Sequence, residues 1–359
     1  MHRVTIQQAS YDNCRDAVNK AFEAFPLEIK ARKVLIKPNV LRASEAHEHI
    51  VTHPSVLRAV VEKVEELSPS QIVVGDNPGI FSYGDNEKSF EKTGLMEAAK
   101  GYYRNLGNAT RRLNFNPHYL ERVEVSEEIM DADIVISLPK FKTHGLTVMT
   151  GAIKNSYGIL AGAQKARLHQ LAGSPGRFHD VIAEVFRLRV PDLFIMDAVV
   201  GMEGSGPASS ELRDIGLILA ADNGVAMDSV VARMMGVEPA DLRFLQHAKA
   251  LGLGDFEPKA IKIEGEMRVL PNFKLPPSLA GDSISGNPAN MEFLSSRILL
   301  RPQADPELCT ACGACIDHCP VSALAIGEVE QTVPQVDAEL CITCFCCQEI
   351  CPEKAITLK

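Results

Sequence analysis

The chain has 359 residues, enough for two or three domains, of which 46% are hydrophobic and 23% charged, as in an ordinary globular protein. Its formal net charge of −9 disfavours nucleic acid as a partner, because proteins that bind nucleic acid usually present an excess of basic residues. The acidic excess is concentrated at the C-terminal end: residues 301–359 hold nine acidic and three basic side chains, a net charge of −6, which leaves −3 for the rest. No apolar run is long enough to cross a bilayer, and the first residues do not resemble a signal peptide, so we expect a cytoplasmic protein with no membrane partner.

Short apolar runs alternate with amphipathic stretches over residues 1–264, a pattern typical of an α/β domain with an open, mostly parallel sheet flanked by helices. Strands are predicted at residues 4–7, 33–36, 71–75, 133–138, 192–196, 215–221 and 260–263. Helices are predicted at residues 12–25, 54–67, 177–189, 225–235 and 239–251, and Thr52 is a candidate cap for the second of them.

Polar side chains follow five of the predicted strands directly. They are Lys37, Asp76, Lys140, Asp197 and Asp222, and each stands beside Gly, Pro or Asn or within a short distance of them. In open α/β sheets, ligands bind in the crevice outside the carboxyl ends of the strands. We therefore expect these five segments to converge on one crevice.

The segment after residue 138 carries the most basic residues of this crevice. If the chain is extended there, Lys140, Lys142 and His144 point the same way, and Lys154 follows downstream, with further basic residues at 165, 167 and 169. Such a cluster favours an anionic ligand, a carboxylate or a phosphate; the alternative is a solvated loop. The predicted anion-binding residues are Lys37, Lys140, Lys142, His144 and Lys154, and the predicted proton donors are Asp76, Asp197 or His144.

Other segments carry weaker signals. Residues 201–207 are rich in Gly but lack the order of a dinucleotide or Walker motif, so we expect a turn. His47, His49 and His53 are close in sequence but are not expected to bind metal. Residues 265–300 are rich in Pro, Ser and Gly and are predicted to be a connector whose apolar residues (Phe273, Leu275, Leu279, Phe293) pack along the larger domain.

Nine of the ten cysteines fall in the last domain, residues 301–359, and eight of them form two copies of the pattern C-x-x-C-x-x-C-x-x-x-C-P. The copies begin at Cys309 and Cys341, and the residues after each copy, 321–326 and 353–358, also match. Soft thiolates at this spacing are typical of iron–sulfur ligation rather than of a disulfide framework. Zinc is the alternative, but it would leave the third and fourth cysteines of each run unexplained.

These runs resemble those of bacterial two-cluster ferredoxins, a small α+β fold in which the fourth cysteine of each run ligates the other cluster. The resemblance implies two 4Fe-4S clusters. Cluster one would take Cys309, Cys312, Cys315 and Cys351, and cluster two would take Cys341, Cys344, Cys347 and Cys319. Cys346, adjacent to Cys347, is expected not to be a ligand, and Cys14 is expected to be a small buried hydrophobic residue.

Four motifs of the larger domain occur in an order that resembles the family called domain of unknown function 362. They are Lys37-Pro38-Asn39, Lys142-Thr143-His144, the stretch 151–155 and the stretch 197–207. The resemblance implies the domain layout but no reaction.

The sequence leads to one main functional hypothesis and two alternatives. The main one is an electron-transfer protein or redox-enzyme component that passes single electrons through two 4Fe-4S clusters to or from a partner protein or a ligand in the crevice. The alternatives are an iron–sulfur cluster carrier or assembly factor, and a reductase of a small anionic substrate. Whether the protein is an enzyme, and its oligomeric state, are left open.

Overall fold

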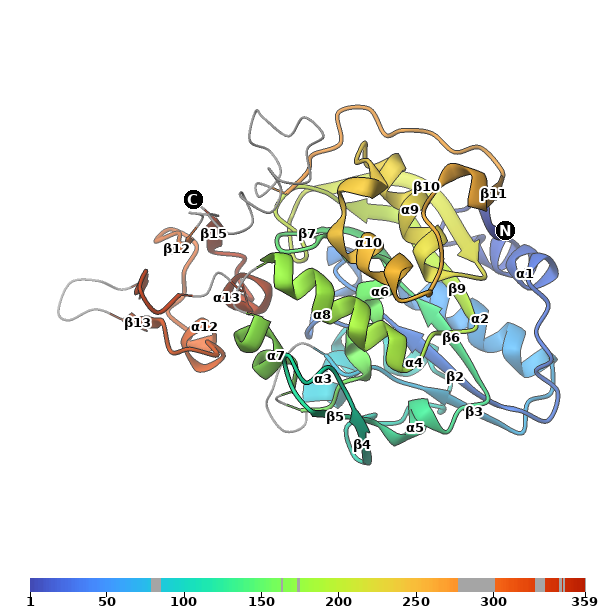
Figure 1. Cartoon of the computed structure of the whole chain (residues 1–359), viewed down its shortest axis with the longest axis horizontal. Helices are drawn as coiled ribbons and strands as arrows, with labels where there is room; N and C mark the ends of the chain where they lie inside the picture. Colours follow the sequence, from blue (N-terminus) through green and yellow to red (C-terminus); the bar gives the residue numbers. More distant parts are fainter. Residues whose placement is uncertain are drawn as a thin grey trace.

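The computed structural model of the chain describes residues 1–78, 85–162, 164–172, 175–276, 301–326, 333–341, 344 and 346–358. Figure 1 shows a large α/β domain, coloured blue to orange, and a small red C-terminal domain that lies beside α7 and β7. The fold is thus the expected α/β class with a small strand-containing C-terminal domain.

The core of the large domain is a mixed, largely parallel sheet with strand order β11-β1-β10-β9-β6-β2-β3, extended by β7, which pairs with β9, and by β8. Its strands are β1 (His2–Gln8), β2 (Lys33–Pro38), β3 (Gln71–Val74), β6 (Ile134–Leu138), β7 (Lys140–His144), β8 (Val148–Met149), β9 (Leu193–Met202), β10 (Leu212–Ala221) and β11 (Ile261–Glu264). The strands β4 (Thr110–Asn114) and β5 (Arg122–Ser126) form a separate hairpin. All seven predicted strands are present, and β7 is the predicted extended segment.

Helices cover both faces of the sheet (Figure 1). They are α1 (Cys14–Ala24), α2 (Pro54–Glu66), α3 (Asp85–Lys92), α4 (Leu95–Ala98), α5 (Glu127–Met130), α6 (Gly151–Asn155), α7 (Gln164–Ala172), α8 (Pro175–Leu188), α9 (Gly224–Met234) and α10 (Arg243–Ala250). Short 3₁₀ helices are η1 (Ala46–Glu48), η2 (Ser156–Ile159), η3 (Pro239–Asp241) and η4 (Pro258–Ala260). The five predicted helices correspond to α1, α2, α8, α9 and the pair η3 and α10.

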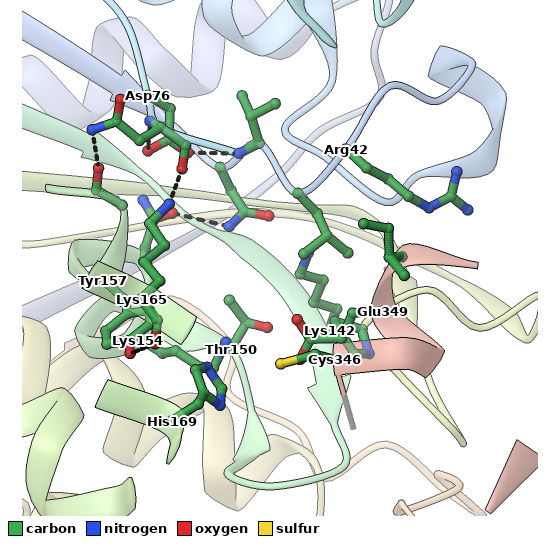
Figure 2. A pocket seen from close by; sticks show the side chains of 18 of the residues that line it. Arg42, Asp76, Lys142, Thr150, Lys154, Tyr157, Lys165, His169, Cys346 and Glu349 are labelled. Atoms are coloured by element: carbon green, nitrogen blue, oxygen red, sulfur yellow. Dashed lines mark hydrogen bonds between the residues drawn. The ribbon is translucent and has the colours of Figure 1, made fainter. Parts of the chain in front are cut away.

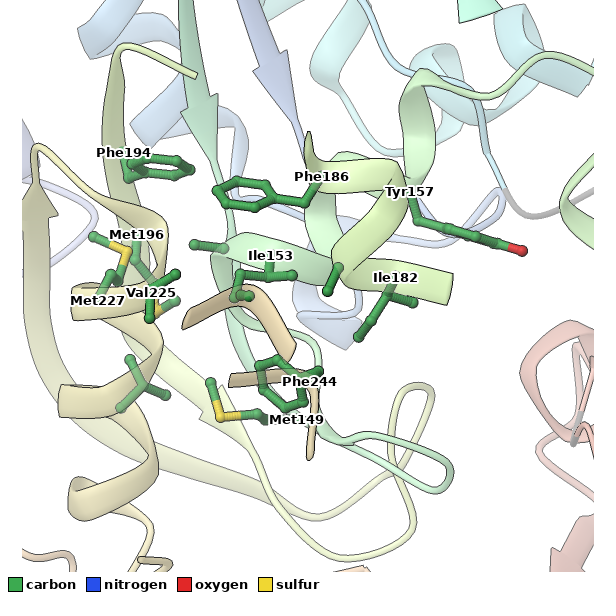
Figure 3. Packing of buried hydrophobic residues seen from close by; sticks show 14 of the residues in the cluster. Met149, Ile153, Tyr157, Ile182, Phe186, Phe194, Met196, Val225, Met227 and Phe244 are labelled. Carbon is green, nitrogen blue, oxygen red and sulfur yellow. The ribbon is translucent and has the colours of Figure 1, made fainter. Parts of the chain in front are cut away.

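Alternation along the strands separates the core into two layers. On β2, Leu35 packs into the layer that contains α8, α9 and α10, whereas Val34 and Ile36 pack into the layer that contains α1 and α2. Figure 3 shows the first layer, where Phe186 of α8 approaches Phe194 of β9 with 6.2 Å between ring centroids. Each such side chain contributes roughly 1.5–3 kcal/mol when fully buried, so the two layers fix the sheet between its helices.

One predicted strand end does not reach the common edge. β10 runs antiparallel to β9, and Ala221 at its end pairs with Phe194 near the start of β9. Asp222 therefore lies at the opposite edge of the sheet from Asp197, and the expectation that all five polar segments converge is wrong for Asp222. The physical reason is the connection: β9 and β10 form a hairpin, in which Gly201 and Met202 end β9 and residues 203–211 connect the strands, so no helix carries the chain back to the first edge.

The C-terminal domain consists of two similar halves. β12 (Pro302–Ala304) pairs with β15 (Ile356–Leu358), β13 (Leu324–Ile326) pairs with β14 (Pro334–Val336), and the helices are α12 (Ala314–Asp317) and α13 (Cys346–Ile350). Cysteine and aliphatic side chains share its small core. The repeated segments seen in the sequence thus become equivalent strands, β13 and β15.

The connector is described up to residue 276. There Leu270, Phe273 and Leu275 pack on the core of the large domain, and Phe273 meets Phe141 edge-on at 5.9 Å. Leu279 and Phe293 lie outside the described residues. The division of the chain into residues 1–264, 265–300 and 301–359 stays a prediction.

Candidate functional site

The carboxyl ends of β2 and β3 bring Lys37 and Asp76 together. The two strands are parallel neighbours, so the residues that follow them leave the sheet at the same edge. Lys37 Nζ lies 2.7 Å from Asp76 Oδ1, and both side chains are buried. Asp76 also accepts hydrogen bonds from the backbone N–H groups of Val40 and Asn77. A Cβ atom on Gly158 would stand 2.0 Å from Asp76 Oδ1, so only glycine allows the backbone of η2 to pack this closely against the Lys37–Asp76 ion pair.

A pocket of about 780 Å³, its open mouth included, lies between this edge of the sheet and α13 of the C-terminal domain (Figure 2). The large domain lines it with the segment after β2, with Asp76, with Lys142 of β7, with Lys154 of α6 and with α7. The C-terminal domain lines it with Cys346 and Glu349, among others. Both domains therefore form the pocket, and we call it the inter-domain pocket.

The predicted crevice residues divide into three groups. Asp76, Lys142 and Lys154 line the inter-domain pocket. Lys37 is paired with Asp76, and His144 contacts Glu349, a residue that lines the pocket. Lys140 and Asp197 are not among the residues that line it.

Three lysines of the inter-domain pocket have no carboxylate partner within 4.0 Å among the described residues: Lys142, Lys154 and Lys165. Lys142 Nζ donates a hydrogen bond to the backbone carbonyl of Ile50 at 2.7 Å, and Lys165 Nζ donates to that of Pro78 at 2.9 Å. Burial lowers the pKa of Lys142 well below its usual value and that of Lys165 to about 7. No carboxylate of the described residues therefore pairs directly with these three lysines when they are protonated.

A direct polar contact joins the two domains beside the pocket. His144 Nε2 lies 2.8 Å from Glu349 Oε1. Because His144 Nδ1 accepts the backbone N–H of Leu146 at 3.1 Å, the ring proton is assigned to Nε2, which faces the carboxylate. Burial lowers the pKa of His144 to about 4, so the imidazole is neutral at pH 7. Burial alone would raise the pKa of Glu349, but His144 and Lys154 lower it to about 2.

Two further contacts join the domains nearby. Lys354 Nζ lies 3.4 Å from Glu48 Oε2, and Gln348 Nε2 donates to the carbonyl of Ser205 at 3.4 Å. Arg42 Nη2 lies 3.7 Å from the same carboxylate oxygen of Glu48. The loops after β2 and β9 therefore hold the cluster-bearing domain against the pocket.

Lys140 and Asp197 form a separate buried ion pair. Lys140 Nζ lies 2.7 Å from Asp197 Oδ2, and neither side chain is accessible to solvent. The hydroxyl of Tyr11 lies 3.1 Å from Lys140 Nζ and donates to Asp197 Oδ1 at 3.2 Å. A register shift in the pairing of β7 with β9 lies between Lys140 and Lys142, so simple alternation does not hold across these two residues. Assignment of Lys140 and Asp197 to catalysis stays a prediction.

Two of the three closely spaced histidines, His49 and His53, make ring contacts with Tyr11. His53 stacks on Tyr11 with 3.6 Å between ring centroids, and its backbone N–H donates to Asp197 Oδ2 at 2.9 Å. His53 also caps α2, because its Nδ1 accepts the N–H of Ser55; Thr52 instead donates to the carbonyl of Leu138, so the predicted Thr52 cap is wrong. Within the described residues, no group of three or more His, Cys, Asp or Glu side chains stands close enough to hold a single metal ion.

The cysteines gather in the two groups that the ferredoxin resemblance implies. One small cavity is lined by Cys319, Cys341, Cys344 and Cys347, the four residues expected for cluster two. Burial, followed by the proximity of Cys351, Cys312 and Cys309, raises the pKa of the Cys315 thiol to about 11, which places Cys315 among the other three residues expected for cluster one. These donor sets fit two cubane clusters, and the assignment of each cysteine stays a prediction.

The two remaining cysteines differ in their surroundings. Cys14 is buried in the core beside α2. Cys346, at the start of α13, lines the inter-domain pocket. Neither its place there nor that of Glu349 was foreseen, because the sequence does not say which face of α13 meets the large domain.

The sequence also did not single out Arg42 and Thr150, and it noted Lys165 and His169 only as downstream basic residues. All four line the pocket. Arg42 and Thr150 lie in irregular segments after strands, where sequence periodicity gives no signal. The exposed Arg167, by contrast, is not among the lining residues.

Known proteins resemble the chain in both domains. The family model described as "Domain of unknown function (DUF362)" matches residues 34–233, and that of a 4Fe-4S dicluster domain matches residues 301–352. Thylakoid-associated protein sll1697 of Synechocystis is 31% identical over 256 residues, covering 68% of this chain and 76% of that protein. A solved structure of a Thermotoga maritima protein is 12% identical, with a TM-score of 0.40, and the match covers 68% of this chain and 59% of that one.

Every helix of the described residues is too short or too polar to span a lipid bilayer. The dicluster domain implies two 4Fe-4S clusters and an iron–sulfur electron-transfer role. With its larger domain matched over 200 residues, the chain belongs to the DUF362 family and ends in a 4Fe-4S dicluster domain.

Proposed function

We propose that this protein is an iron–sulfur redox component that exchanges single electrons with a small anionic ligand bound in the inter-domain pocket. The observation that carries the proposal is the position of α13. This helix begins at Cys346, between the predicted ligands Cys344 and Cys347 of cluster two, and its residues Cys346 and Glu349 line the pocket. A ligand in the pocket is therefore next to the segment that holds a cluster.

The chain's own residues supply binding and protons. When bound, 4Fe-4S clusters supply one-electron oxidation and reduction. Lys142 and Lys154 present ammonium groups to the ligand, and enclosure between the domains strengthens these interactions because it excludes water. Lys165, whose burial lowers its pKa to about 7, can give a proton to a reduced ligand near neutral pH. Asp76 is less suited to that role because it is held by Lys37.

The cluster assignment is tested first, by anaerobic reconstitution, iron analysis and EPR under dithionite. The native chain should give two 4Fe-4S signals. If the runs cross as predicted, Cys309→Ala combined with Cys351→Ala leaves one cluster, whereas Cys309→Ala combined with Cys319→Ala removes both. Cys346→Ala is the matched control and keeps both. Zinc in place of iron, or one cluster in the native chain, would refute the redox proposal.

Electron exchange is tested with the reduced, dithionite-free protein. We expect one class of reducible anion, screened among nitrite, sulfite and unsaturated carboxylates, to restore the visible absorption of the oxidised clusters. Lys142→Met and Lys154→Met should slow this reoxidation at least about tenfold, since each removes a charge-assisted contact, and exposed Lys20→Met should not change it. If iron moves to an apo-acceptor while no anion accepts electrons, the cluster-carrier alternative replaces the proposal.

The cellular location and the partner protein stay predictions. A basic one-electron donor protein would suit the acidic C-terminal domain, whose residues 301–359 carry a net charge of −6. The Synechocystis relative is named for association with thylakoids.

A further inference from the structure

The inter-domain pocket contains more positive charge than its own carboxylates balance. Four ammonium groups lie in it or directly behind it: Lys37, Lys142, Lys154 and Lys165. Only two carboxylates accompany them. Asp76 is paired with Lys37, and Glu349 is shared between His144 and the more distant Lys142 and Lys154. With all four lysines protonated, the described side chains of the site would thus carry an excess of two positive charges.

Polar atoms without a partner line the same pocket. Within the described ranges of the chain, Thr150 Oγ1, His169 Nδ1 and Asn39 Oδ1 have no hydrogen-bond partner, although the three residues are only 3%, 8% and 8% exposed. Buried polar groups are almost always satisfied in native proteins. Figure 2 shows Thr150 and His169 on the same side of the pocket as Lys154 and Lys165. Polar atoms without a hydrogen-bond partner and lysines without a carboxylate partner therefore lie in the same pocket.

Other charged residues of the pocket do not account for this excess. Arg42 has its own counter-charge, Glu48, at 3.7 Å. His169 is neutral at pH 7, because burial lowers its pKa to about 3. Buried charges in proteins are normally paired, since an ion removed from water without a partner is strongly disfavoured. The unpaired positive charge can be removed in two ways: the lysines lose their protons, or an anion binds beside them.

We propose that the inter-domain pocket binds a polyanion, a small molecule with at least two negative charges in phosphoryl or carboxylate groups, between Lys142, Lys154 and Lys165. This inference rests on the proposed function only for the idea that the ligand is also the redox partner; binding itself needs no electron transfer. Thr150 and His169 complete the site as hydrogen-bonding groups. Lys165, with its pKa near neutrality, takes up a proton as the anion arrives.

The test is calorimetric titration of the oxidised, cluster-containing chain with inorganic phosphate and with citrate, each against sodium chloride of the same ionic strength. We expect saturable binding of at least one polyanion and none of chloride. Binding of phosphate alone assigns a phosphoryl group, and binding of citrate alone assigns carboxylates. At pH 7.5 the apparent enthalpy should depend on the buffer, because a proton is taken up. No saturable binding of either polyanion overturns the proposal.

Three lysine variants localise the site. Lys142→Met and Lys154→Met should each weaken binding about ten- to a hundredfold, as expected for loss of a hydrogen bond to a charged group, whereas exposed Lys20→Met binds as the native chain does. Without polyanion, Lys154→Met should also unfold at a higher temperature than the native chain, because it removes an unbalanced charge. Unchanged binding in both pocket variants overturns the proposal even if they fold normally.

The outcome is separable from that of the proposed function. A polyanion that binds but never reoxidises the reduced clusters leaves this site in place and removes the redox role. If the clusters exchange electrons with an anion whose affinity is the same in Lys142→Met and Lys154→Met, the redox role is supported and this binding site is refuted.

Discussion

At the scale of single residues, buried lysines distinguish this molecule. Lys37, Lys140 and Lys142 are each at most 1% exposed, yet only the first two have a carboxylate within 3 Å. The paired lysines lie at the carboxyl edge of the sheet beside their counter-charges, and the unpaired one lines the inter-domain pocket. On β7 alone, buried lysine therefore has two different environments: Lys140 is in an ion pair, and Lys142 lines the pocket without a carboxylate partner.

The Lys140–Asp197 pair gives a prediction at this scale. Asp197→Asn should lower the free energy of unfolding by about 3–5 kcal/mol, because it leaves a buried ammonium group without its counter-charge. Urea unfolding of the cluster-containing chain measures the change. The matched control is Glu97→Gln, which breaks the exposed Arg58–Glu97 pair (46% and 84% exposed) and should change stability by less than about 1 kcal/mol. Equal effects of the two would contradict the role given to burial.

At the scale of elements, α6 is the part that places Lys154 in the pocket. The helix is five residues long and begins at Gly151 with φ of +59°. Asp228 of α9 accepts the N–H groups of Ala152 at 2.6 Å and Ile153 at 3.0 Å. A short helix has little stability of its own, so Asp228 holds its first turn from a neighbouring element.

Gly151→Ala should destabilise the chain more than Gly101→Ala, measured by urea unfolding. Both positions have positive φ, which disfavours a side chain by roughly 1–2 kcal/mol. At Gly151 the added Cβ would also stand 2.3 Å from Asp228 Oδ1, whereas at Gly101 it meets nothing within 4 Å. The difference between the variants isolates the contact with Asp228. Equal losses would mean that Asp228 does not constrain α6.

The whole molecule contains a pH-sensitive set of buried histidines. Burial lowers the pKa of His144 and His179 to about 4 and that of His169 to about 3, against roughly 6.5 in an unfolded chain. Between these values the unfolded chain binds more protons than the folded one, so stability is complete above pH 6.5 and falls as the pH decreases toward 4. Burial raises the pKa of Asp228 to about 7, so this one carboxyl group has the opposite effect and favours the folded state as the pH decreases below 7.

We therefore expect the free energy of unfolding to fall between pH 7 and pH 5, by up to about 1.4 kcal/mol per pH unit for each histidine. His179 is distant from the cysteines in sequence and donates to the carbonyl of Leu146 at 2.9 Å, while its Nδ1 accepts the N–H of Phe244. His179→Gln should reduce the slope by one histidine's share, and exposed His118→Gln should not. If the pH dependence of the free energy of unfolding is the same in His179→Gln as in the native chain, His179 does not contribute to it.

The sequence alone determined the fold class, the seven strands first predicted in the sheet and the presence of the dicluster domain. Apolar periodicity predicts strands and helices, and the fixed spacing of cysteines on one loop predicts cluster ligands. Both signals depend only on residues close together in the sequence. It also predicted that Asp76 lies in the crevice, because parallel strands bring their ends to one edge, and that Lys142 and Lys154 lie there as members of a basic cluster; all three line the inter-domain pocket. For the same reason it erred at Asp222, where an antiparallel hairpin broke the assumption.

Only the tertiary structure decided what closes the crevice. Glu349 and Cys346 are nearly 200 residues away from Lys154 in sequence, and the docking of α13 that brings them together depends on scattered contacts such as His144–Glu349 and Lys354–Glu48. It likewise separated Lys140 and Asp197 from the pocket, through a register shift that no periodicity encodes. Residue spacing along the chain determines local structure such as strands, helices and cysteine loops. The contacts between surfaces that are distant in sequence are determined only by the packing of the complete fold.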